Sequence, residues 1–473
     1  MTFASVEYLI FYLIVFLLYW FLGRNKTLQN TFILMASLVF YGWWDWRFSG
    51  LLLITVLTTF YGGLMLQKAD DNSKKRKWIS CGVIVVNLCI LFFFKYYNFF
   101  VQSFIDTFSL FGKELSASTL NIVLPVGISF YTFTALSYTI DVYQRKIEAT
   151  NDMLAYCAYV MFFPSILSGP ISRATKQLPQ YFEKREFNYD KAVEACKYIL
   201  MGAVMKLCLA DRLGIYVDAV YANIVQHSGT TLLFASILYS IQIYADFAGY
   251  SLMAIGSGKL LGIELQTNFI RPYFSKTVTE FWRRWHISLT SWFRDYIYFP
   301  LGGNRVSKAR WMLNTMIVFV VSGLWHGAAY TFLIWGTLHG LCMIAERIIY
   351  GKRIKEISDK PTVMNILRML FTFGIVSFAW IFFRADSFMD ALVIIKSIFT
   401  DPGSLFVDIT TLLMALIALI IVFLYDCSQE YRLKLSFLSS KSVVVRHAAV
   451  VLLICYIIGF GVFNSGSFIY FQF

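Results

Sequence analysis

The sequence predicts an all-α polytopic membrane protein, a bundle of about 11–12 transmembrane helices with additional re-entrant or interfacial helices. Of the 473 residues, 58% are hydrophobic and 15% are charged, whereas soluble domains carry about 25% charged residues. The apolar runs last roughly 17 to 25 residues, the length of a membrane-spanning helix, and a β-barrel would show shorter alternating segments. No internal repeat or low-complexity linker divides the chain, so residues 1–473 are expected to form one integral-membrane domain.

The first part of the chain sets the expected orientation. Its candidate spans are residues 6–22, 28–46, 49–66, 78–94 and 121–140. The loop from Lys68 to Lys77 is rich in basic residues and is therefore expected in the cytoplasm. Counting back three spans places the N-terminus on the extracytoplasmic side. Residues 96–119 are aromatic and then polar, as expected of an outer loop or a surface helix.

The segment 153–167 breaks this alternation. It is apolar but short, it contains Pro164, and Gly169 and Pro170 follow it. The loop beyond it is basic and should also be cytoplasmic. A re-entrant segment that returns to the same side satisfies both observations, and irregular backbone inside a membrane requires cover by protein or by a water-filled cavity.

The remaining candidate spans are residues 192–209, 231–261, 311–325, 328–349, 363–383, 410–425 and 443–462. The net charge of +13 comes from basic loops, which set topology and meet anionic membrane lipids. Without a basic groove outside the membrane, nucleic-acid binding is excluded. The eight cysteines form no CxxC motif, so we interpret them as small buried hydrophobic residues.

Three of the five histidines, His286, His326 and His339, fall between residues 281 and 340. A helix that starts near Trp311 at the cytoplasmic edge places His326 roughly 22 Å away, beyond the middle of a ~30 Å core. On the returning helix His339 lies about 12 Å from Arg347. Imidazole suits general-base catalysis near neutral pH. The alternative to a catalytic role is that the histidines only form hydrogen bonds between helices. Their spacing matches no zinc-ligand pattern, so no metal is expected.

Asp246 is a second polar group inside an apolar segment. A buried carboxylate needs a cation or several hydrogen-bond donors, and Arg283, Arg284 and Arg294 are the expected sources of that cation. Asp246 then either orients a histidine or joins two helices, and the sequence leaves both alternatives open. Arg294 and Asp295 are adjacent and are expected to form an ion pair at the membrane interface.

Several motifs carry a resemblance to a known family. They are FWRRWHISL at residues 281–289, WFRDYIY at 292–298, DFAGY at 246–250, NF at 268–269, PY at 272–273, LWHGA at 324–328, SGPI at 168–171 and FIYFQF at 468–473. Together they resemble the membrane-bound O-acyltransferase family, and within it the bacterial alginate O-acetylation branch.

The resemblance implies a family-type helical bundle that encloses a funnel. It also implies that His326 is an essential catalytic residue and that His286 is a second important histidine. The residues expected to line the substrate path are Trp325, His339, Asp246, Tyr250, Arg283, Arg284, Arg294, Asp295 and Asn268.

The function expected from this resemblance is O-acetylation in the bacterial cell membrane. The acyl donor would be a cytoplasmic thioester, acetyl-CoA, with no bound cofactor. The acceptor would be an extracytoplasmic polysaccharide, reached directly or through a partner acetyltransferase with a serine nucleophile. The chain itself has no Gly-x-Ser-x-Gly motif, which argues against an acyl-serine here. The alternatives are a transporter, or a long-chain lipid or protein acyltransferase that uses the same bundle.

Overall fold

The chain folds into helices that span most of its length. The computed structural model describes residues 1–71, 73–109, 120–351, 361–433, 437–463 and 468–469, and within these ranges it contains no β-strand. Seven of the described helices are long and apolar enough to cross a membrane: α3, α4, α11, α15, α16, α18 and α19. The all-α, multi-pass membrane class is therefore confirmed, while a total of about 11–12 crossings stays a prediction.

The structure divides into two compact units. The first contains Met1–Ala195 and Ala254–Gln266, and the second contains Cys196–Met253 and Thr267–Phe473. That residues 1–473 act as one membrane domain stays a prediction.

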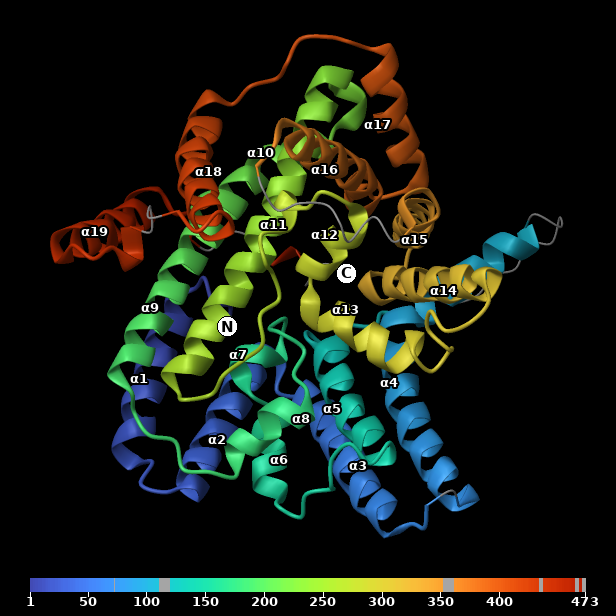
Figure 1. The fold of residues 1–473 in the computed structure, drawn as a ribbon, viewed down its shortest axis with the longest axis vertical. Coiled ribbons are helices and arrows are strands. Elements are labelled where there is room, and N and C mark those ends of the chain that lie inside the picture. Colours follow the sequence, from blue (N-terminus) through green and yellow to red (C-terminus); the bar gives the residue numbers. More distant parts are fainter. Residues whose placement is uncertain (72, 110–119, 352–360, 434–436, 464–467, 470–473) are drawn as a thin grey trace. The chain divides into compact units, whose positions relative to one another are not determined.

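The first unit begins with the helices drawn from blue to teal in Figure 1. They are α1 (Val6–Leu22), α2 (Lys26–Asp45), α3 (Phe48–Lys68), α4 (Lys74–Ser109), α5 (Ile128–Tyr143), α6 (Met153–Val160), α7 (Phe163–Ile166) and α8 (Ala174–Gln177). The long helices α1, α2 and α3 pack on one another in sequence order, and α3 also packs on α5.

Two buried arginines hold this unit together. Arg185 donates hydrogen bonds to the Tyr19 hydroxyl on α1, at 2.7 Å, and to Oδ1 of Asn30 on α2, at 2.8 Å. Arg76 donates to the carbonyls of Leu66 and Val142, both at 2.9 Å, near the C-terminal ends of α3 and α5. The last carbonyls of a helix have no partner within the helix and carry partial negative charge, so the Arg76 guanidinium group satisfies carbonyls of two helices at once.

The first unit corrects two expected boundaries. Helix α4 runs without a break to Ser109, so residues 96–109 continue a helix and do not form a separate loop; residues 110–119 lie outside the described residues. Helix α5 starts only at Ile128, because Gly127 before it adopts a left-handed conformation with φ of 77°. The break expected in 153–167 is confirmed as two short helices, α6 and α7.

The second unit contains both long and short helices. They are α10 (Asp211–Tyr221), α12 (Val278–Arg284), α13 (Ile287–Phe293), α14 (Lys308–His326), α15 (Tyr330–Tyr350), α16 (Val363–Arg384), α17 (Phe388–Thr400), α18 (Ile409–Glu430) and α19 (Val443–Phe460). Two further helices, α9 (Tyr189–Ala203) and α11 (Gly229–Leu260), carry residues of both units. The expected span 192–209 corresponds to α9 followed by a π-helix, Val204–Ala210, which leads into α10.

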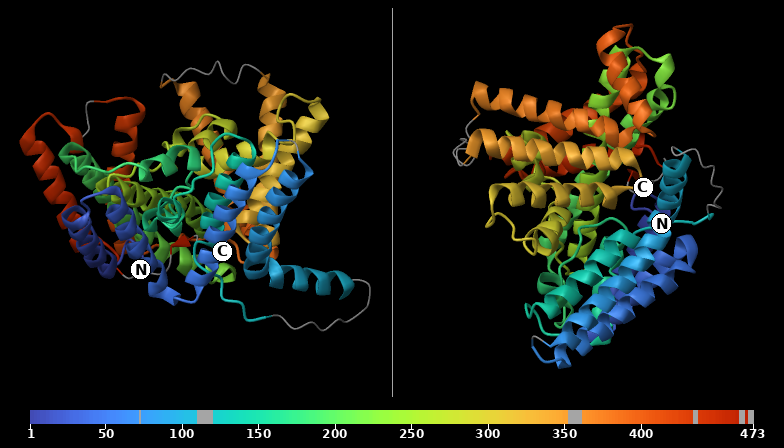
Figure 2. Two further views of the ribbon diagram at one scale, coloured as in Figure 1. Left: turned by 90° about the horizontal axis from the view of Figure 1, so that it is seen from below. Right: turned by 90° about the vertical axis from the view of Figure 1, so that its right-hand side faces the viewer.

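Helices α14, α15 and α16 form a layered stack in the second unit, seen clearly on the right of Figure 2. Glycines make the contact between α14 and α15 close. A Cβ atom at Gly323 would collide with the Phe332 carbonyl, and one at Gly336 would collide with the Phe319 carbonyl. Small residues at such positions let helix backbones approach in membranes. This close packing fixes the relative positions of the histidines on α14 and α15.

Candidate active site

The three histidines predicted from the sequence lie together in the second unit. The ring centroids of His286 and His326 are 6.4 Å apart. Trp335 connects His326 to the third histidine: the centroid of its ring lies 5.0 Å from that of His326 and 5.1 Å from that of His339. All three imidazoles are buried, with exposed fractions of 3% or less. The structure therefore confirms that residues forty positions apart in the chain converge on one aromatic cluster.

His326 is the last residue of α14, at the point where the chain turns into α15. Its ring packs edge to face against Trp325, at 4.9 Å, and against Phe383 of α16, at 5.3 Å. Gly327 follows in an extended conformation and ends the helix. A Cβ atom at Gly327 would collide with the Phe332 ring, so only glycine fits the turn that sets the orientation of His326.

His286 stands directly before α13 in an unusual backbone conformation. Its φ of 41° and ψ of 53° lie in the left-handed region, which non-glycine residues rarely occupy. Asn268 holds the residues that follow: its carbonyl accepts a 2.9 Å hydrogen bond from the Ile287 N–H, and its side-chain oxygen accepts one from Ser288 at 3.4 Å. Asn268 is therefore a positioning residue for His286.

Burial determines the charge of His286. The ring is fully buried beside Phe247, whose centroid lies at 4.7 Å. Loss of hydration disfavours the charged imidazolium, so burial lowers the pKa of His286 to about 3. The ring is then neutral near pH 7 and carries one N–H that can donate a hydrogen bond.

His339 has a defined tautomer. The indole N–H of Trp282 donates a 3.2 Å hydrogen bond to Nδ1 of His339. A ring nitrogen that accepts cannot also carry a proton, so a neutral His339 holds its proton on Nε2. Trp282 also packs against Trp335, at 5.7 Å, and thereby joins α12 to the cluster on α15.

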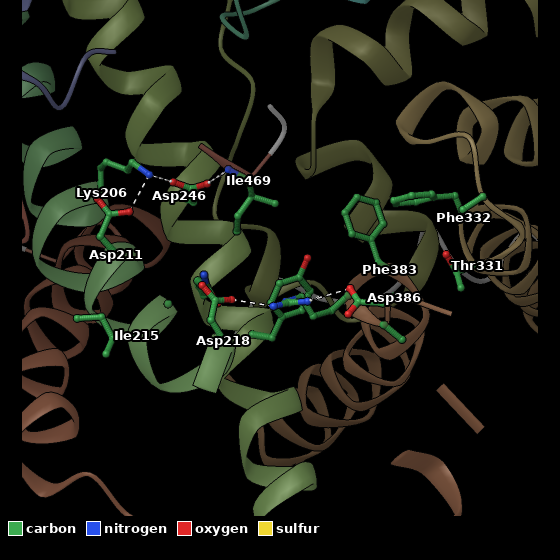
Figure 3. Close-up of a pocket in the computed structure, with 16 residues that line it drawn as sticks. Lys206, Asp211, Ile215, Asp218, Asp246, Thr331, Phe332, Phe383, Asp386 and Ile469 are labelled. Atoms are coloured by element: carbon green, nitrogen blue, oxygen red, sulfur yellow. Dashed lines mark hydrogen bonds and ion pairs between the residues drawn. The ribbon is translucent and has the colours of Figure 1, made fainter. Parts of the chain in front are cut away.

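The structure corrects the expected partner of Asp246. Its carboxylate pairs with Lys206 at 2.5 Å, and Lys206 also pairs with Asp211 at 2.8 Å. Asp246 further accepts a 2.9 Å hydrogen bond from the Ile469 N–H, and these contacts are drawn in Figure 3. None of the three arginines is its partner. Sequence reasoning missed Lys206, whose signal was a lysine inside the expected span 192–209.

The arginines have other positions. Arg284 pairs with Glu430 at 2.9 Å and with Glu280 at 2.7 Å, so it joins α12 to α18. Arg294 pairs with Asp295 at 2.8 Å, as expected. Arg283 is exposed.

The remaining sequence candidates are buried around the histidines. The Trp325 ring lies 5.8 Å from His286, while the Tyr250 ring stacks on Phe468 at 4.6 Å, on the far side of Phe247. Within the described residues, no group of three or more His, Cys, Asp or Glu side chains could hold a metal ion.

Several cavities lie near the histidine cluster. One of them, of about 580 Å³, is lined by His339 itself together with apolar side chains of α16 such as Phe371 and Phe378. The Trp282 cavity, of about 320 Å³, is mainly apolar and lies along α14 between Trp311 and Ser322, one helical turn before His326; Arg283 and Arg294 also line it. The Asp218 cavity, of about 420 Å³, lies beyond His326 and is polar. It is lined by Lys206, Asp211, Gly214, Ile215, Asp218, Tyr239, Gln242, Asp246, Ala329, Thr331, Phe332, Phe383, Arg384, Ala385, Asp386 and Ile469, most of which Figure 3 labels.

A pair of buried histidines with an apolar cavity and a cavity of charged and aromatic residues nearby, inside a helical membrane protein, is an arrangement suited to group transfer. Comparison with known proteins identifies the group. The model of the membrane-bound O-acyltransferase family matches residues 38–385, and the chain belongs to this family. It is therefore a membrane O-acyltransferase.

The names of its relatives refer to alginate, peptidoglycan and teichoic acid. The chain is 39% identical to a Pseudomonas aeruginosa protein named "Probable alginate O-acetylase AlgI", over 85% of this chain and 75% of that protein. It is 32% identical to the peptidoglycan O-acetyltransferase of Helicobacter pylori, over 79% and 74% of the two chains. Identity to the teichoic acid D-alanyltransferase of Bacillus subtilis is 27%, over 68% and 80%.

Proposed function

We propose that this protein takes an acetyl group from a cytoplasmic thioester, acetyl-CoA, and delivers it to hydroxyl groups of an extracytoplasmic polysaccharide. Delivery is direct or passes through a serine of a partner protein. The protein acts in the cell membrane with its N-terminus outside. The observation that carries the proposal is the approach of the His286 and His326 rings to 6.4 Å beside the Trp282 cavity. The names of the alginate and peptidoglycan relatives support acetyl as the group transferred.

The donor is assigned to the Trp282 cavity. Arg283 and Arg294 line it, and Arg294 is more than half exposed, so both can attract the phosphates of coenzyme A. The apolar walls, with Trp282 and Phe319 among them, suit the uncharged arm that carries the thioester. The basic loop before α14 contains Arg305, and such loops favour the cytoplasmic side. This orientation places the donor cavity nearer the cytoplasm than His326.

His326 acts as general base in the proposed reaction. The acceptor oxygen attacks the thioester carbonyl carbon while its proton moves to His326. The tetrahedral intermediate carries a negative oxygen, to which the N–H of neutral His286 donates. The intermediate then releases the coenzyme A sulfur, which takes the proton from His326 and leaves as the thiol. One C–O bond forms and one C–S bond breaks, and both histidines return to their starting state.

Acetyl transfer by purified protein in lipid vesicles tests the function. With labelled acetyl-CoA on the side of the vesicle membrane that the basic loops face and a saccharide acceptor on the other side, wild-type protein is expected to cleave the thioester, and His326→Ala to lose about 100-fold or more of the rate. The matched control is His447→Ala, because His447 is exposed on α19. Thermal unfolding of each variant checks that folding is intact. Undiminished cleavage by His326→Ala would remove the general-base role, and substrate flux without any thioester cleavage would favour a transporter.

A further inference from the structure

We propose that the Asp218 cavity binds the acceptor, and that the acceptor group that enters it is an uncharged saccharide unit and not a uronate. This inference rests on the proposed function, because it names the substrate class of that reaction.

The cavity connects an exposed mouth to a buried floor. The side chains of Asp386 and Asp218 at the mouth are 84% and 63% exposed, whereas that of Asp246 at the floor is 2% exposed. Arg384 pairs with both mouth carboxylates, 2.8 Å from Asp218 and 3.7 Å from Asp386; the two aspartates are labelled in Figure 3. A ligand can therefore enter from outside the bundle.

The inner wall of the cavity adjoins the catalytic histidine. Phe383 lines the cavity, and its ring contacts the His326 ring at 5.3 Å. Phe332 also lines the cavity and packs on Phe383 at 4.9 Å. Ala329 and Thr331 contribute from the turn directly after His326. One side chain, Phe383, therefore contacts both the cavity and the imidazole. The cavity volume of about 420 Å³ lies within the range of roughly 300–1,000 Å³ typical of small-ligand sites.

Two polar groups in the wall have no partner in the described part of the chain. The hydroxyl of Tyr239 and the side-chain oxygen of Gln242 are buried without a hydrogen bond there, in residues that are 1% and 7% exposed. A buried polar atom without a partner is costly, so a ligand that satisfies it gains affinity. Sugar hydroxyls both donate and accept, which matches a carboxylate, an amide, a phenol and a guanidinium in one cavity. The Phe332 and Phe383 rings offer apolar surface to the sugar ring.

The charge of the cavity selects among saccharides. Four carboxylates line it, from Asp211, Asp218, Asp246 and Asp386, against only two cations, Lys206 and Arg384. Both cations are already paired with these carboxylates. A carboxylate-bearing sugar would meet an excess of negative charge, and like charges close together in a protein cost free energy. A neutral sugar meets no such penalty.

The test uses full-length protein in vesicles with labelled acetyl-CoA. The two acceptor probes are a glucose tetramer and a glucuronate tetramer with the same linkage. Wild-type protein is expected to acetylate the glucose tetramer with a kcat/KM about tenfold or more above that for glucuronate. Tyr239→Phe removes one hydroxyl, and we expect it to raise the KM for glucose tetramer about threefold to tenfold with little change in kcat.

A double variant of the two mouth carboxylates tests the effect of the charge of the cavity. The double variant Asp218→Asn with Asp386→Asn is expected to reduce the preference for glucose over glucuronate about threefold or more at low salt, and by less at high salt. Asp401→Asn is the matched control, because Asp401 is exposed and does not line the cavity. It should leave the preference unchanged.

Transfer of the label at saturating acceptor, compared between wild-type protein and His326→Ala, separates the two proposals. If no acceptor, neither tetramer nor partner serine, receives label in a His326-dependent reaction, the proposed function itself fails. If transfer occurs but Tyr239→Phe leaves the acceptor KM unchanged, the cavity assignment fails. Equal or better transfer to glucuronate overturns the charge assignment. Transfer to neither tetramer, with label appearing only on a serine of an added partner protein, overturns the saccharide assignment.

Discussion

Lys206 provides the sharpest test of how the second unit is held together. Its Nζ lies 2.5 Å from Asp246 and 2.8 Å from Asp211, and the side chains of the three residues are 7%, 2% and 9% exposed. Lys206→Met keeps the length and the apolar stem but leaves two buried carboxylates without their cation. Breaking a buried ion pair from one side costs about 3–5 kcal/mol. Asp246 keeps the hydrogen bond from Ile469, so we expect a loss near the lower end, about 3 kcal/mol.

The assay is chemical and thermal unfolding in detergent micelles, combined with a double-mutant cycle. Asp246→Asn removes one of the two carboxylates that lose their contact with Lys206 in Lys206→Met. The double variant should therefore cost less than the sum of the two single variants, by about 1–3 kcal/mol. Lys191→Met is the control: Lys191 pairs with Glu264 at 2.8 Å, but the side chains are 54% and 61% exposed, so its loss should cost at most about 1 kcal/mol.

Two results would refute the reasoning. If Lys206→Met unfolds together with the wild type, the ion triad does not stabilise the fold. If the double variant costs the full sum of the single variants, Lys206 and Asp246 act independently, and the short contact between them has no energetic consequence.

Three further predictions concern the site. Gly336→Ala should destabilise the protein and lower thioester cleavage, because its Cβ would collide with the Phe319 carbonyl on α14, whereas Gly374→Ala on α16, with open space around it, should change neither unfolding nor rate. His286→Asn and His286→Ala both remove the imidazole, so both should slow thioester cleavage. Asn tolerates the left-handed backbone better than Ala, so the free energy of unfolding of His286→Asn should be about 1 kcal/mol higher than that of His286→Ala. Arg283→Gln should raise the KM for acetyl-CoA about threefold, less at high salt, with kcat unchanged; an unchanged KM would move the donor away from the Trp282 cavity.

The long spans were predictable because bilayer thickness determines their length. Residues 6–22 match α1 at both ends, and the expected spans 311–325 and 363–383 match α14 and α16 to within about three residues. Interfacial boundaries were less predictable. A helix that leaves the membrane no longer needs apolar residues, so α4 continues through polar positions to Ser109 without any change of backbone that composition could signal.

The histidine cluster was predictable in part. Depth along a helix follows from 1.5 Å per residue, so the sequence could place His326 and His339 in a shared interior. It could not show that Trp335 contacts both, or that His286 adopts a left-handed conformation, because these depend on packing between helices far apart in the chain.

The partner of Asp246 was missed for a specific physical reason. Residues five apart lie on different faces of an α-helix, where neighbours are three or four apart, so Lys206 and Asp211 do not look like a pair in the sequence. The segment Val204–Ala210 is a π-helix, whose hydrogen bonds join residues five apart, and this brings the two side chains to 2.8 Å. Lys206 then bridges two carboxylates on the wall of the Asp218 cavity. π-helical turns are frequent at functional sites, so the same local change of periodicity that hid the ion triad from sequence reasoning supports the acceptor site that we propose in this cavity.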